Sequence, residues 1–127
     1  VRQLQQLGVD IIDCSSGGLT EQTKALPVPR GLGFQVPFAQ KVKAQTGVTT
    51  QAVGMIVDAH QAEEILASGS ADLIAIGREA LFDPYWPLHA QWALEKDPRF
   101  TDWHLRYKVW LEKRQVFLDR HLGQPSS

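Results

Sequence analysis

The chain has 127 residues, of which 43% are hydrophobic and 21% are charged, a composition that fits one small folded domain and excludes a disordered chain. Its 13 basic and 14 acidic residues give a net charge of −1, which argues against nucleic acid as a partner. No apolar run approaches the ~20 residues that span a bilayer, so we expect no membrane partner.

The single cysteine, Cys14, excludes an internal disulfide and fits a reducing compartment. No signal peptide is visible, and we therefore expect a cytoplasmic protein. The chain starts at Val1, inside an expected helix, and a start without Met indicates a fragment or a processed product.

Helices and strands are expected to alternate along the first part of the chain. Residues 1–7 are predicted to form a helix that Gly8 ends. Further helices are expected from Pro37 to Gly47 and from Asp58 to Gly69, and Asp58 with Gln61 resembles a capping box. Between the first two helices, residues 17–35 hold four glycines and two prolines, which predicts a long loop.

Three apolar runs predict strands over residues 9–16, 51–56 and 72–76. The runs are continuous, as is typical of parallel strands that are buried on both faces. The alternation with helices indicates an α/β fold, either open and doubly wound or closed into a barrel. Three strands are too few for an independent domain of this kind, so the sequence is expected to be the back part of a larger barrel.

The remaining residues are expected to be helical. Short breaks at Asp83-Pro84 and Asp97-Pro98 separate helices over residues 78–81 and 85–95 from a last helix. Thr101 or Asp102 is expected to cap this last helix, and Gly123 and Pro125 are expected to end it. The tail is rich in aromatic residues, for which packing of the last helices is the simpler explanation. For Tyr107 and Trp110 we prefer a place in an active site or a subunit interface.

Glycines near the ends of two successive strands suggest a phosphate site. Gly54 lies in the second run, and Gly77 follows the third and is itself followed by Arg78. In (β/α)8 barrels a phosphate commonly binds between the last two strand ends and a short extra helix. Either glycine alone would indicate only a tight turn, and Arg78 alone a surface salt bridge. The combination predicts that all three bind phosphate.

Other polar residues give weaker signals. Ser15 and Ser16 end the first strand, on the side where ligands bind in such sheets. Cys14 is expected to be a small buried side chain and not a nucleophile. The four histidines show no metal-binding spacing, so no metal site is predicted.

Several segments together resemble one family. They are residues 8–17, 35–39, 52–56, 61–66, 71–81 and 84–87. In order and spacing they are similar to the C-terminal third of the Old Yellow Enzyme family, in its bacterial NADPH dehydrogenase and xenobiotic reductase branch. The resemblance implies the C-terminal part, about strands six to eight, of an FMN-binding TIM (β/α)8 barrel in residues 1–100, with a C-terminal tail helix in residues 101–127.

The resemblance also implies an activity. Members of the family are flavoproteins that take hydride from NADPH or NADH onto FMN and pass it to an activated alkene such as an enone. By this resemblance Gly77 and Arg78 would bind the FMN phosphate, Gly54 would offer its backbone N–H to it, and Ser15 and Ser16 would lie near the flavin. Tyr107 and Trp110 would match a tail aromatic of the substrate pocket, and the full-length parent is expected to be a homo-oligomer.

The family's catalytic residues would lie upstream of Val1, so no catalytic residue is assigned and these 127 residues alone are expected to be inactive. Two alternatives stay open. One is a catalytically inactive, truncated half-barrel that acts only by association through its strand edges. The other is a different phosphate-binding barrel enzyme, such as a nucleotide-monophosphate dehydrogenase.

Overall fold

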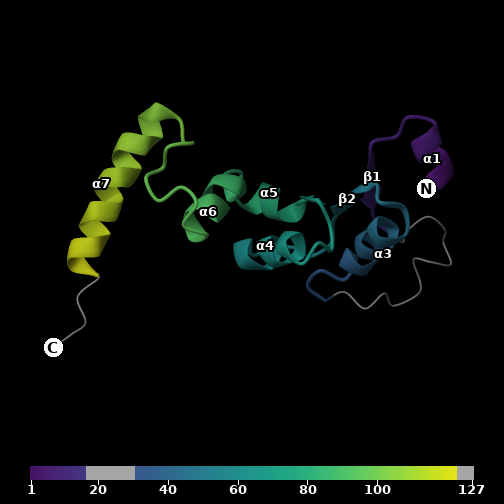
Figure 1. Cartoon of the computed structure of the whole chain (residues 1–127). Coiled ribbons are helices and arrows are strands. Elements are labelled where there is room, and N and C mark those ends of the chain that lie inside the picture. The colour runs from purple at the N-terminus through teal and green to yellow at the C-terminus, as the bar shows by residue number, and fades with distance from the viewer. Residues whose placement is uncertain (17–30, 123–127) are drawn as a thin grey trace. The chain divides into compact units, whose positions relative to one another are not determined.

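The structure, a computed structural model, describes residues 1–16 and 31–122 of the chain (Figure 1). Two compact units follow one another, Val1–Pro84 and Tyr85–Ser127. The predicted division at residue 100, between barrel units and tail, stays a prediction. Gly123, Pro125 and most of the loop expected over residues 17–35 lie outside the described residues.

The first unit holds a three-stranded parallel sheet in the order β1-β2-β3. The strands are β1 (Ile11–Cys14), β2 (Thr49–Ala52) and β3 (Leu73–Ile74). Its helices are α1 (Arg2–Gln6), α3 (Val36–Thr46), α4 (Ala59–Ala67) and α5 (Arg78–Phe82). Helix α3 packs on β1 and β2, and α4 contacts β3. The predicted α/β class with parallel strands is therefore confirmed.

The strands are shorter than predicted, and β2 is shifted toward the N-terminus. β2 begins at Thr49 and ends at Ala52, so Gly54 lies in the turn that follows. The chain leaves the extended conformation there because Gly54 has φ +109° and Met55 has φ +54°. The prediction that the strands are buried on both faces is wrong for the outer ones. Ile11 in β1 is 49% exposed and Leu73 in β3 is 40% exposed, because each strand pairs on one side only within the described chain.

Most helix boundaries agree with the sequence signals. Pro37 lies in the first turn of α3, and Gly47 ends that helix in the left-handed conformation at φ +67°. At the start of α4, Asp58 Oδ1 accepts hydrogen bonds from His60 N and Gln61 N at 2.9 and 3.1 Å. The reciprocal bond of a capping box, from Asp58 N to the Gln61 side chain, does not form. The Gln61 side chain instead accepts from Val57 N at 3.0 Å and donates to Met55 O at 3.1 Å, which fastens the turn after β2 to α4.

A carboxylate joins the sheet to α3. Asp72, just before β3, accepts a hydrogen bond from the backbone N of the fully buried Thr50 at 2.9 Å. Its other oxygen lies 2.8 Å from Lys43 Nζ of α3. The bond to Lys43, and then the bond from Thr50 N, lower the pKa of the Asp72 carboxyl below its usual value. Asp72 therefore holds α3, β2 and β3 together as an ionised group.

The second unit contains α6 (Trp86–Ala93) and α7 (Leu105–His121). The prediction that Thr101 or Asp102 caps the last helix is wrong. His104 is the N-cap, and its Nδ1 accepts from Arg106 N at 3.3 Å. The backbone N–H groups of Thr101 and Asp102 donate to the buried carboxylate of Asp97, at 2.7 and 3.0 Å, so they belong to a turn that precedes the helix.

The expected aromatic packing is found around one residue of the tail. Trp103 is 8% exposed, and its ring lies 5.2 Å from that of Tyr85 and 6.4 Å from that of Phe100. No residue of α7 is buried. None of the helices in the described ranges combines the length and apolar character needed to cross a membrane.

Candidate functional site

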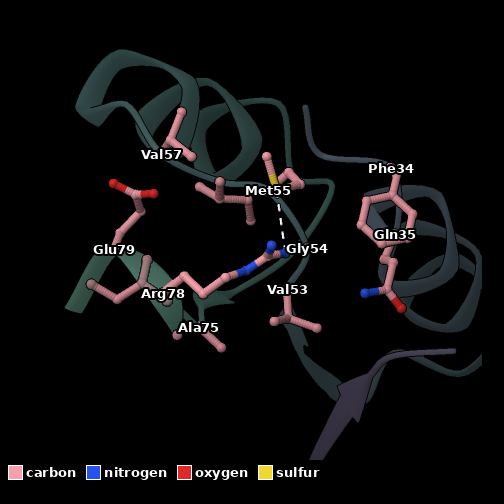
Figure 2. A pocket seen from close by; sticks show the side chains of 12 residues that line it. Phe34, Gln35, Val53, Gly54, Met55, Val57, Ala75, Arg78 and Glu79 are labelled. Carbon is pink, nitrogen blue, oxygen red and sulfur yellow. Dashed lines mark hydrogen bonds between the residues drawn. The ribbon is translucent and has the colours of Figure 1, made fainter. Parts of the chain in front are cut away.

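A hollow of about 270 Å³ lies in the first unit, where β2 and β3 end (Figure 2). Its walls come from the segment before α3, from the turn after β2 and from the corner between β3 and α5. The lining residues are Phe34, Gln35, Val53, Gly54, Met55, Ile56, Val57, Ala75, Ile76, Gly77, Arg78 and Glu79. The structure thus brings Gly54, Gly77 and Arg78 to one cavity, as the sequence predicted.

Gly54 is required by its surroundings. Its φ of +109° is one that L side chains rarely adopt. A Cβ at this position would also lie 2.8 Å from Gln35 Nε2 and 3.0 Å from Phe34 Cε1. Gly77 differs, because a Cβ there would meet no atom within 4 Å. The backbone at Gly54 is therefore closely packed against the segment that precedes α3, whereas the space beside Gly77 is open.

Arg78 reaches across the hollow toward the opposite wall. Its Nη2 donates to Met55 Sδ at 3.4 Å, and Figure 2 shows the side chain extended toward Met55 and Gly54. The described residues contain no ion pair for Arg78, so the alternative of a surface salt bridge is not supported. A thioether is a weak acceptor, which leaves the guanidinium able to bind an anion. The one acid in the lining, Glu79, points toward Val57 in Figure 2.

Sequence reasoning missed Gln35 as a site residue. It is the N-cap of α3, only 7% exposed, and its Oε1 accepts a hydrogen bond from Ser16 N. Its position directly before the Val36-Pro37 helix start was part of the family resemblance, but a glutamine there carries no local signal of ligand binding. The bond links the end of β1 to the pocket wall.

The polar groups of the lining include side-chain hydrogen-bond donors. Arg78 supplies a permanent positive charge, and Gln35 supplies an amide. The backbone at Gly77 is open on the side where a Cβ would lie, whereas at Gly54 that side is filled by Gln35 and Phe34. Such a set can hold an anionic group that also carries acceptor oxygens, and phosphate is the common biological example.

The comparison with known families agrees with this geometry. The family model described as "NADH:flavin oxidoreductase / NADH oxidase family" matches residues 1–97, which is most of the chain and includes the whole pocket lining. The chain belongs to this flavin oxidoreductase family. The resemblance to the Old Yellow Enzyme family is thus confirmed, and a nucleotide-monophosphate dehydrogenase is not supported.

Curated members of the flavin oxidoreductase family are similar to this chain. An NADPH dehydrogenase of Geobacillus thermodenitrificans is 43% identical over 91 residues, which cover 71% of this chain and 25% of that protein. An NADPH dehydrogenase of Bacillus subtilis is 50% identical over 84 residues, covering 65% of this chain and 23% of that protein. An NADPH dehydrogenase of Bacillus pumilus is 51% identical over 84 residues, which cover 66% of this chain and 24% of that protein. The chain spans about a quarter of the length of these relatives.

The family and these names support FMN and NADPH as the cofactors of the group.

The other residues expected at the flavin site lie outside the pocket lining. Ser15 and Ser16 are exposed, and Ser16 reaches the lining only through its bond to Gln35. Tyr107 and Trp110 belong to the second unit, where they are 51% and 68% exposed. The Tyr107 ring lies 6.2 Å from that of Tyr85, and Lys113 Nζ lies 4.6 Å above the Trp110 ring. The placement of these four residues near a flavin stays a prediction.

Two further expectations concern reactive groups. Cys14 is buried, and burial, followed by the nearby charge of Asp13, raises the pKa of its thiol. The expected burial is confirmed, and a raised pKa leaves less of the reactive thiolate at neutral pH. Across residues 1–16 and 31–122, no three His, Cys, Asp or Glu side chains gather in a way that could hold a metal ion.

Proposed function

We propose that this chain is the FMN-phosphate-binding part of an NAD(P)H-dependent ene-reductase, in which it forms strands six to eight of a (β/α)8 barrel. When bound, FMN would supply the hydride chemistry by which an activated alkene such as an enone is reduced. The proposal includes a cytoplasmic, homo-oligomeric parent in which Tyr107 and Trp110 line the substrate pocket and Ser15 and Ser16 lie near the flavin.

The observation that carries the proposal is the convergence of two successive βα corners on one hollow. Gly54 follows β2, Gly77 follows β3, and both line the cavity that Arg78 enters. A barrel phosphate site is commonly built from two such neighbouring corners.

The residues present fit a phosphate group. The guanidinium of Arg78 would offset the dianionic charge and fix the direction of the phosphate through paired N–H groups. The open space beside Gly77 would let phosphate oxygens approach the backbone. The absence of a side chain at Gly54 would let the other corner lie close to the segment before α3, because a side chain there would collide with Gln35 and Phe34.

The test compares FMN with riboflavin, which lacks the phosphate, in titrations of the 127-residue chain followed by flavin fluorescence. We expect FMN to bind more tightly and inorganic phosphate to compete with it. Arg78→Ala should weaken FMN binding on the order of tenfold to a hundredfold, which corresponds to loss of a hydrogen bond to a charged group.

The matched control is Arg99→Ala, which removes the same charge from an exposed position in the second unit. It should leave FMN binding unchanged. Equal binding of FMN and riboflavin, or an Arg78→Ala variant that binds FMN as the wild type does, would refute the phosphate site.

A second candidate is a half-barrel without catalysis that acts by association. The exposed apolar residues of the outer strands, Ile11 and Leu73, favour it. The 127 residues alone are expected to be inactive under either function, so a turnover assay can only count against this second candidate. Reduction of an enone by the 127-residue chain, with FMN and NADPH added, would exclude the candidate that lacks catalysis.

A further inference from the structure

Gln35 is a polar side chain that the phosphate site does not explain. It lines the hollow, although only 7% of its surface is exposed. Burying an amide is unfavourable unless both of its ends find hydrogen-bond partners. Its Oε1 has a partner in Ser16 N, whereas the structure shows no hydrogen bond from its Nε2 to any of residues 1–16 and 31–122.

The bond from Ser16 fixes which end of the amide faces the pocket. An amide nitrogen cannot accept a hydrogen bond, so the oxygen must face Ser16 N–H and the nitrogen must face the other way. Nε2 lies beside Gly54, since a Cβ on that glycine would be 2.8 Å from it. Figure 2 shows the nitrogen on the side of Gln35 that faces Val53 and the cavity. The pocket therefore contains a fixed donor in addition to Arg78.

The size of the cavity limits which part of a ligand can use this donor. Pockets for whole small molecules run from about 300 to 1,000 Å³. At about 270 Å³, this hollow lies just below that range, and a chain of a few atoms that ends in phosphate fits such a volume. The ribityl phosphate arm of FMN is such a chain, and its hydroxyl oxygens are hydrogen-bond acceptors.

We infer that Gln35 is a recognition residue whose Nε2 donates a hydrogen bond to a ribityl hydroxyl of FMN while Arg78 holds the phosphate. The inference rests on the proposed function and extends it. The site then selects a polyol phosphate over a bare phosphate, and Ser16 contributes indirectly by holding the amide in its donor orientation.

The test uses two small probes, ribitol 5-phosphate and methyl phosphate, in NMR titrations of the 127-residue chain. Both carry the phosphate, but only the first carries the hydroxyl chain. Wild type should bind ribitol 5-phosphate about fivefold to tenfold more tightly, as one added hydrogen bond predicts. The Gln35 side-chain amide signals should move with ribitol 5-phosphate and stay in place with methyl phosphate.

Two variants separate the donor from the packing of the side chain. Gln35→Glu keeps an acceptor for Ser16 N–H but loses the donor, and Gln35→Met keeps the length without either. In both, the ratio of the two affinities should fall to about one, because only the hydroxyl chain senses the donor. Arg78→Ala should weaken both probes and keep the ratio.

The outcomes distinguish the two proposals. If wild type binds both probes equally, or if the Gln35→Glu ratio stays at the wild-type value, the role of Gln35 is refuted while the phosphate site stands. If Arg78→Ala binds methyl phosphate as the wild type does, the phosphate site itself is wrong. Failure of wild type to bind either probe refutes both.

Discussion

Gly54 and Gly77 line the same cavity, yet the missing side chain has a different effect at each position. We expect Gly54→Ala to lower the free energy of unfolding by about 2 kcal/mol, because it adds an unfavourable φ and a collision with Gln35. Urea unfolding followed by circular dichroism measures this.

Gly77→Ala is the matched comparison for Gly54→Ala. Its φ of −112° is available to alanine, and the new methyl group meets no protein atom within 4 Å. The urea midpoint of Gly77→Ala should equal that of wild type or rise slightly. Its affinity for FMN should fall, because the methyl group narrows the space through which the phosphate would approach the backbone at residue 77. A Gly77→Ala variant that loses as much stability as Gly54→Ala would contradict this distinction.

Asp72 makes stability depend on pH in the acid range. The hydrogen bond to Lys43 is the largest cause that lowers its pKa in the folded chain. The ionised carboxylate therefore stabilises the fold fully when the pH is above the pKa of an Asp in the unfolded chain, about 3.9. This contribution is lost as the pH falls through the folded-state pKa. We expect the urea midpoint of wild type to decrease below about pH 4, and that of Asp72→Asn to be lower at neutral pH and to change less with acid.

The exposed carboxylate of Asp10 offers a control for Asp72, since the described residues show no hydrogen bond to its side chain. Asp10→Asn should keep the acid dependence of wild type. An Asp72→Asn variant with an unchanged acid dependence would show that the bonds to Lys43 and Thr50 do not stabilise the fold.

At the level of helices, boundaries were predictable where one residue carries the signal. Pro37, Gly47 and Asp58 each act through their own backbone geometry or a bond to the next turn, so the local sequence determines the boundary. The start of α7 was not predictable in this way. Thr101 and Asp102 have the chemistry of caps, but Asp97, a few residues earlier, binds their N–H groups first.

Asp97 therefore controls the turn before α7. Burial raises the pKa of its carboxyl, but bonds from Asp102 and Thr101 more than offset this and leave the pKa lowered, so the group is ionised at neutral pH. In Asp97→Ala, the amide protons of Thr101 and Asp102 should exchange with solvent faster, on the order of tenfold, because they lose a charged acceptor. Hydrogen exchange followed by NMR measures this.

Asp102→Asn is the control for that experiment, since it changes an exposed side chain in the same turn and keeps the backbone N–H. Its exchange rates should match those of wild type. Unchanged exchange in Asp97→Ala would mean that the turn holds its shape without the carboxylate.

The strands and the site were predictable to different degrees. Apolar runs located all three strands, but β2 starts at Thr49, because pairing with β1 determines where a short strand begins and the hydrophobic pattern does not. Gly54, Gly77 and Arg78 could be assigned to one cavity since parallel strand ends meet at one edge. Gln35 could not, because its role depends on a bond to Ser16, which is 19 residues away along the chain.

At the scale of the whole molecule, the outer strands expose apolar side chains. Ile11 in β1 is 49% exposed and Leu73 in β3 is 40% exposed, and unpaired strand edges promote association. We expect the 127-residue chain to self-associate at high concentration and the double variant Ile11→Lys, Leu73→Lys to shift toward monomer in sedimentation velocity. Equal association of the two chains would place the contact elsewhere.

The distribution of one residue type across the molecule has a practical consequence. All four tryptophans, at positions 86, 92, 103 and 110, belong to the second unit, and the first unit has none. The indole emission of this protein thus originates outside the unit that holds Gly54 and Arg78. Tryptophan fluorescence therefore reports on the second unit, whereas the visible absorbance of a flavin bound at the proposed site would report on the first unit.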